Sequence, residues 1–170
     1  MNWTELLHSE IEDTYRATEG LMNLVDDDKL DWAPESGVEW MSTRKLLRHL
    51  SDACGWCAAN FVHDRWPQVM KGEAQDQPPT SVESVAEAKA ELAKDKQRVL
   101  DAISAAGEEA LASRMVQAPW EPVARPLGQQ VLQMVNHLNL HKSQLFYYLK
   151  LQGKPVNTWT LYGLPQPPAE

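Results

Sequence analysis

Long apolar runs are missing from this sequence of 170 residues, and so is an export signal. A helix that crosses a membrane needs roughly 20 consecutive apolar residues, whereas charged residues interrupt every candidate helix here within two turns. The first residues, Met1 to Glu5, contain neither the basic segment nor the apolar segment of a secretory signal. The sequence therefore predicts a cytoplasmic protein that does not insert into a membrane.

Cysteine and cationic residues are also scarce. The only cysteines are Cys54 and Cys57, so the sequence predicts no disulfide framework. Lys and Arg number 16 against 24 Asp and Glu, so the net charge is −8. No stretch of the sequence gathers the cationic residues into a patch that could follow a phosphate backbone. Nucleic acid is therefore not an expected partner. Hydrophobic residues at 43% and charged residues at 24% are typical of one globular domain, here expected over residues 1–170.

Hydrophobic residues recur at three- and four-residue intervals in four segments, which predicts four amphipathic helices. The segments are about 3–25, 43–65, 82–106 and 127–152, and a C-terminal arm over 153–170 is expected to end as a loose tail near Pro167 and Pro168. Thr80 and Glu83 have the spacing of a capping box before the third helix, and Gly107 is placed to end it.

Proline and glycine interrupt the connections between these helices, for example at Pro34 and Gly37 in the first of them. The connection over 67–79 is predicted to hold no regular element and is long enough to run from one end of a bundle to the other. The one over 111–126 leaves room only for a short extended run. The predicted fold class is all-α, a four-helix bundle with long crossover connections.

Three histidines are candidates for holding a metal ion. His137 and His141 are four residues apart, so they lie on one face of the last helix about one turn apart. Such a pair alone more often lines a core or a surface than a metal site. His49 is expected on the inward face of the second helix, where it can approach the pair across the bundle. Burying three imidazoles is costly unless something such as a metal satisfies their nitrogens.

Two polar residues near these histidines are weaker candidates. Gln144 lies one turn beyond His141, and Asp52 follows His49 by three residues, so each can orient a histidine or contact a substrate. Solvated side chains are at least as common at such positions. Leu138 stands where a zincin-type peptidase has its catalytic glutamate, which excludes that class.

Tryptophan is abundant, at seven residues, and the two cysteines have CxxC spacing. Four of the indoles can wall a pocket for an apolar or aromatic substrate, or simply anchor the core and the loops: Trp40, Trp56, Trp66 and Trp120. Cys54 and Cys57 are predicted to fall in the middle of the second helix, which favours small apolar packing over a redox site.

The sequences around the histidines resemble a known family. Residues 42–50 (Ser-Thr-Arg-Lys-Leu-Leu-Arg-His-Leu) and 136–145 (Asn-His-Leu-Asn-Leu-His-Lys-Ser-Gln-Leu) are similar to the DinB superfamily, the DinB/YfiT-like four-helix-bundle candidate metalloenzymes. The likeness continues through residues 149–156 and 161–163. Lys142 and Ser143 depart from the Arg-Gly pair that the family often has there.

The resemblance implies that His49, His137 and His141 are ligands of one divalent metal ion, most often nickel or zinc. Such an ion can lower the pKa of a bound water or polarise a substrate oxygen or thiol. The implied function is a metal-dependent enzyme acting on a small molecule by hydrolysis or by thiol-linked transfer, with a low-molecular-weight thiol as a candidate partner. A non-catalytic, metal-stabilised module is the alternative, and a homodimer is compatible with both and expected.

Overall fold

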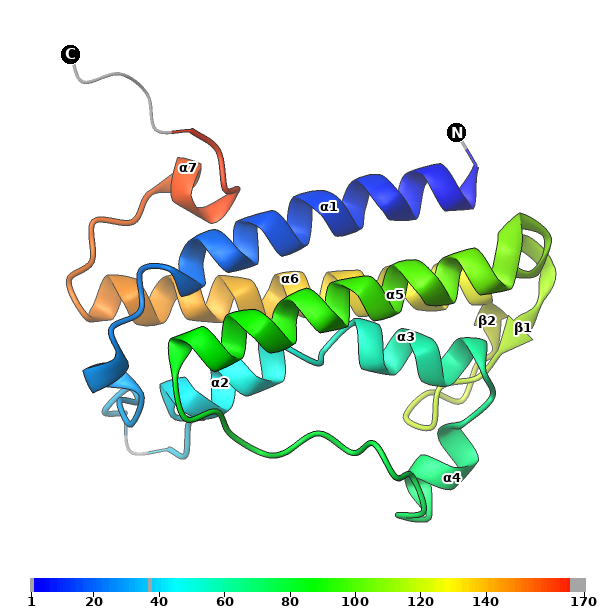
Figure 1. Cartoon of the computed structure of the whole chain (residues 1–170), viewed down its shortest axis with the longest axis horizontal. Coiled ribbons are helices and arrows are strands. Elements are labelled where there is room, and N and C mark those ends of the chain that lie inside the picture. Colours follow the sequence, from blue (N-terminus) through cyan, green and yellow to red (C-terminus); the bar gives the residue numbers. More distant parts are fainter. Residues whose placement is uncertain (1, 37, 166–170) are drawn as a thin grey trace.

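The computed structural model describes residues 2–36 and 38–165, so Met1, Gly37 and the predicted tail at Pro167 and Pro168 lie outside the described residues. Its framework is four long helical segments, and the all-α prediction is confirmed (Figure 1). They are α1 (Trp3–Met22), α2 with α3 (Thr43–Leu50 and Gly55–Val62), α5 (Val85–Ser113) and α6 (Leu127–Leu151). The shorter elements are η1 (Asp27–Lys29), α4 (Trp66–Met70), β1 (Met115–Val116), β2 (Arg125–Pro126) and α7 (Thr158–Leu161).

One long crossover sets the topology. After α3 and α4, the segment 71–84 runs back along the bundle to the end where α2 began (Figure 1). As a result, α2, α3 and α5 run in the same direction, while α1 and α6 run against them. Met115 of β1 pairs with Pro126 of β2 in an antiparallel ladder, which turns the chain between α5 and α6.

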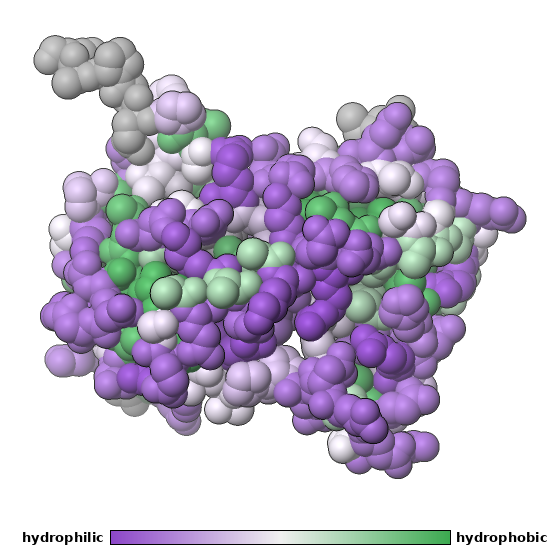
Figure 2. Space-filling view, in the orientation of Figure 1, coloured by the Kyte–Doolittle hydropathy of each residue, from purple (hydrophilic) through white to green (hydrophobic). Residues whose placement is uncertain are grey.

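The four long segments meet along one hydrophobic core. Each contributes side chains that are completely buried, among them Leu7, Ile11, Leu47, Ile103 and Leu138. The face of the molecule shown in Figure 2 is mostly hydrophilic, as expected for helices with one apolar stripe. Among the described residues, no helix is both long and apolar enough to cross a membrane.

The second predicted helix, 43–65, is wrong in one respect, because the structure has two helices there with a turn at 51–54 between them. Asp95 of α5 explains the break. Its carboxylate is 1% exposed and accepts the backbone N–H groups of Gly55 and Trp56, both at 2.7 Å. Tyr15 of α1 donates its hydroxyl to the same carboxylate at 2.7 Å. Since Gly55 and Trp56 open α3, the cap of this helix comes from another helix.

The cysteines therefore lie at the start of a helix and not in the middle of one as predicted: Cys54 directly precedes α3, and Cys57 is in its first turn. A helix N-terminus favours a thiolate, but burial acts in the opposite direction and is the larger effect here. Burial raises the pKa of Cys57 to about 12 and that of Cys54 well above its usual value. Both thiols stay protonated at neutral pH, as expected of packing residues.

Gly55→Ala is expected to destabilise the protein, because α3 begins in direct contact with α5. A Cβ at Gly55 would stand 2.0 Å from the carbonyl oxygen of Asp95, so a helix must move. We expect a loss of about 2–3 kcal/mol in the free energy of unfolding, measured by urea denaturation. Gly20→Ala in α1 is the matched control: a Cβ there meets nothing within 4 Å, and the variant should gain up to about 1 kcal/mol. Equal midpoints for the two variants would contradict this account.

The start of the third predicted helix also needs correction, since α5 begins at Val85 rather than near Val82. The sequence holds two consecutive cap patterns, at Thr80 to Glu83 and at Ser84 to Glu87. The structure uses the second: the Ser84 hydroxyl accepts the Glu87 N–H at 3.0 Å. Val82 is instead fully buried in an extended segment, with its carbonyl bonded to Arg44.

Two smaller features also differ from the sequence prediction. The connection predicted to lack elements contains α4, which has Pro67 in its first turn, where a missing N–H costs nothing. Gly107 has a φ of +71° and a ψ of 165°, a positive-φ backbone that favours glycine and kinks the helix, but helical residues resume beyond it up to Ser113. The remaining boundaries differ by a few residues: α1 ends at Met22 and α6 at Leu151.

Candidate metal centre

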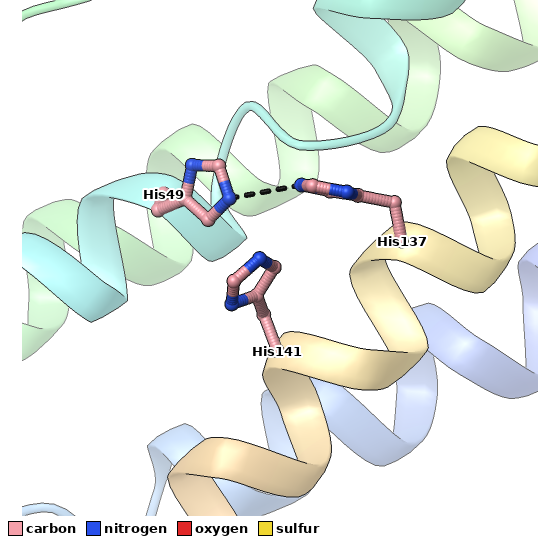
Figure 3. A group of neighbouring side chains, drawn as sticks. All are labelled: His49, His137 and His141. Carbon is pink, nitrogen blue, oxygen red and sulfur yellow. Dashed lines mark hydrogen bonds between the residues drawn. The ribbon is translucent and has the colours of Figure 1, made fainter.

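His49, His137 and His141 converge between α2 and α6 (Figure 3). His49 lies in the last turn of α2, and the other two lie on successive turns of α6 with their rings turned toward it. One nitrogen of each ring lies within 4.8 Å of the others, and all three side chains are half-buried. Among residues 2–36 and 38–165, no other group of three His, Cys, Asp or Glu residues is spaced to hold an ion.

The donor set fits a divalent transition metal. The Nε2 atoms of His49 and His137 are 2.9 Å apart, close enough for one to donate a hydrogen bond to the other. Two nitrogen ligands of a tetrahedral ion, each bonded at about 2.0–2.1 Å, stand about 3.3 Å apart. For His49 and His137, a ring movement of a few tenths of an ångström would therefore bring the Nε2 atoms to the separation of two ligands of one ion. Imidazole is a suitable ligand for zinc, nickel, copper and iron alike.

The surroundings keep two of the imidazoles neutral. Burial lowers the pKa of His49 to about 4, with a further decrease from the neighbouring His141 and His137. Burial and the proximity of His141 also lower the pKa of His137. A ligand must present a lone pair, which a neutral imidazole has on one ring nitrogen, so at neutral pH neither ring has to be deprotonated from the imidazolium before it binds an ion.

A chain of hydrogen bonds fixes the ring orientation of His141. Its Nδ1 lies 3.0 Å from Gln144 Oε1, Gln144 Nε2 donates to the Tyr148 hydroxyl at 3.1 Å, and that hydroxyl donates to the Met41 carbonyl at 2.8 Å. A carbonyl only accepts, so the direction of every bond is determined. Nδ1 of His141 therefore carries the proton, and its Nε2 presents the lone pair toward the other histidines. We call His141, Gln144, Tyr148 and Met41 the histidine relay.

Gln144→Leu is expected to weaken metal binding 10–100-fold, the usual effect of removing a partner that orients a metal ligand. Gln144→Glu should retain most of the affinity, because a carboxylate oxygen can still accept from Nδ1. Asn139→Leu, a change at an exposed position on the opposite face of α6, should leave the dissociation constant unchanged. The check is a competition titration with a chromophoric zinc chelator. A Gln144→Leu variant that binds zinc as tightly as the wild type would rule out the orienting role.

Asp52, the other polar candidate, also lies beside a histidine. Its Oδ1 is 3.9 Å from His49 Nδ1, too long for a hydrogen bond, and its Oδ2 accepts from Arg48 Nε at 3.1 Å. Burial raises the pKa of Asp52 to about 6, although the Arg48 charge opposes this shift. The Arg48 side chain is 8% exposed and also pairs with Glu91. Asp52 thus borders the metal centre on the Nδ1 side of His49.

Of the four tryptophans considered as pocket walls or as core and loop anchors, three lie together and Trp40 lies apart from them. Trp56 packs edge-on against Trp66, with ring centroids 5.7 Å apart, and Trp120 packs against Trp66 at 5.1 Å. The Trp56 indole donates to the Asp76 carbonyl. Trp40 instead lies against Tyr148 of the histidine relay, at 6.5 Å. Sequence reasoning overlooked Tyr148, although its position seven residues after His141 places it on the same face of α6.

Comparisons with known proteins bear on the fold and on the family of the chain. The chain resembles a candidate member of the DinB family from Exiguobacterium sibiricum 255-15, whose crystal structure superposes with a TM-score of 0.66 at 19% identity. The alignment covers 94% of this chain and 98% of that one, and at this identity it supports the fold. None of the curated proteins compared with the chain matches it. A family model, described as the DinB superfamily, matches residues 10–145 and so includes all three histidines. Since this match extends over most of the sequence, the chain belongs to the DinB superfamily.

Proposed function

We propose that His49, His137 and His141 bind one divalent metal ion, with nickel or zinc expected, and that the protein is a metal-dependent enzyme acting on a small molecule. The observation that carries this proposal is the convergence of three imidazole nitrogens within 4.8 Å at a half-buried site. Catalytic metal sites typically have three protein ligands and keep a further position open for substrate.

The residues around the site have separable roles in this proposal. His49, His137 and His141 bind the ion, the histidine relay orients His141, and Arg48 holds the Asp52 carboxylate beside His49. When bound, the ion supplies Lewis acidity, which suits either hydrolysis or the transfer of a group to or from a thiol. The resemblance to the family's thiol-dependent members favours a low-molecular-weight thiol as one substrate.

The test is turnover that depends on one metal. The protein is stripped with a chelator, reloaded with zinc or nickel, and assayed against activated esters for hydrolysis and against an aryl halide with 2-mercaptoethanol for thiol transfer. Turnover that disappears with the chelator and returns with one metal supports the proposal, provided that the His137→Ala variant, prepared identically, is inactive. Equal turnover by that variant would reveal a contaminating enzyme.

The alternative is a non-catalytic module in which the ion ties α2 to α6. This alternative draws on the fact that the histidines come from two helices that are distant in sequence, as in structural metal sites that stabilise a fold. It predicts that chelation lowers the midpoint of thermal unfolding while no substrate turns over with any metal.

A further inference from the structure

A cleft of about 470 Å³ lies along α6, at the side chains of the histidine relay that orient His141. Its walls include Trp40 from the connection before α2 and five residues of the C-terminal half of α6: Leu140, Gln144, Tyr147, Tyr148 and Leu151. Its volume is within the usual range of small-molecule sites, about 300–1,000 Å³.

The cleft and the metal centre share residues. Gln144 and Tyr148 line the cleft and are also the two side chains that connect His141 to the Met41 carbonyl. Leu140, another lining residue, directly precedes His141 on α6. A molecule seated in the cleft therefore contacts the same side chains that hold a metal ligand in position.

The walls of the cleft are apolar and uncharged. None of the lining residues that the structure describes carries a charge, in a protein where charged residues make up 24%. Leu140, Tyr147 and Leu151 are 72%, 62% and 66% exposed, so they leave apolar surface open on α6. The ring of Tyr148 is held edge-on by Trp32 at 5.1 Å, which makes that wall rigid. Such walls favour an uncharged aromatic or branched alkyl group and disfavour a charged one.

We propose that this cleft binds the apolar part of the substrate, an uncharged aromatic or alkyl group, while the polar end of the same molecule reaches the metal centre. The inference rests on the proposed function and adds a substrate class to it. A second copy of the chain is the competing occupant of exposed apolar surface. The shared residues Gln144 and Tyr148 favour the substrate, because a dimer contact would not require continuity with the histidine relay.

The experiment compares two probes that share a metal-binding group and differ in their apolar part. Zinc-loaded protein is titrated by calorimetry with acetohydroxamic acid and with 3-phenylpropanohydroxamic acid. We expect the phenyl compound to bind at least about tenfold more tightly, since each buried CH₂ contributes about a fourfold gain. Tyr147→Ser and Leu151→Ser should bring the ratio of the two affinities toward one. Val123→Ser, which changes a residue 57% exposed in the connection between β1 and β2, should preserve the ratio.

Each other outcome overturns the inference in a recognisable way. Equal affinities for the two probes in the wild type would refute the cleft as a substrate site and leave the metal proposal standing. If the protein bound zinc but neither probe, the bound ion would have no position open to a substrate. That result would contradict both the proposed enzyme function and the substrate cleft. A wild-type dimer in sedimentation experiments that Tyr147→Ser and Leu151→Ser turn into a monomer would assign the cleft to a second copy of the chain.

Discussion

Replacing His49 by alanine, or His137 and His141 together, is expected to remove the bound metal ion from the purified protein. Tag-free wild-type protein should contain close to one equivalent of metal by elemental analysis, and both variants should contain almost none. The reason is geometric: α2 supplies one imidazole and α6 supplies two, with ring centroids 4.3–5.1 Å apart. Neither helix alone offers three donors.

The same variants give a second readout in thermal unfolding. A ligand that binds only the folded state at 100 times its dissociation constant adds about 2.7 kcal/mol of stability. Zinc or nickel should therefore raise the unfolding midpoint of the metal-free wild type but not that of the variants. His63→Ala is the control, because His63 is exposed and lies outside the three-histidine group. A wild-type protein that arrives without metal and accepts neither zinc nor nickel would contradict the metal centre altogether.

Asp95→Ala should lower the free energy of unfolding by about 3 kcal/mol or more relative to the wild type, a larger loss than that expected for Gly55→Ala. The substitution leaves three buried donors without an acceptor: the N–H groups of Gly55 and Trp56 and the hydroxyl of Tyr15. Each unsatisfied buried donor costs about 1–3 kcal/mol, offset in part because a carboxylate no longer has to be buried.

Urea denaturation followed by circular dichroism measures this loss. Asp101→Ala is the matched control on α5, since Asp101 is exposed and its change should stay within about 0.5 kcal/mol of the wild type. Asp95→Asn keeps one acceptor oxygen and should be intermediate, which preserves the test if the alanine variant does not fold. If the urea midpoints of Asp95→Ala and Asp101→Ala were the same, the Asp95 cap on α3 would not contribute to the stability of the protein.

Sequence patterns predicted the features that are determined within a single helix, namely the existence of the helix and which residues share one of its faces. The last helix has a clear apolar periodicity, and the four-residue spacing of His137 and His141 fixes their common face whatever surrounds them. His49 follows from its place on the apolar face of the second helix. The family resemblance joined the three histidines into one site, and the structure brings them together.

Patterns along the chain could not predict features that depend on a partner from another helix. The break between α2 and α3 exists because Asp95 of α5 caps Gly55. The residues next to the break do not indicate in the sequence that a carboxylate 40 residues later will cap α3. The use of Ser84 rather than Thr80 as the cap goes together with a hydrogen bond from Arg44, distant in sequence, to the Val82 carbonyl between them. In the same way, Tyr148 was recognisable as an orienting residue only after the Met41 carbonyl was seen to receive its hydroxyl proton.

During synthesis, α3 leaves the ribosome 40 residues ahead of the carboxylate that caps it. A helix of 8 residues does not persist alone in water, so α3 should form only after α5 has emerged and docked. His137 and His141 emerge later still, on the last long helix. The three imidazoles therefore first meet only after α6 has emerged, so the ion should be acquired once α6 has docked on α2 rather than while α2 stands alone.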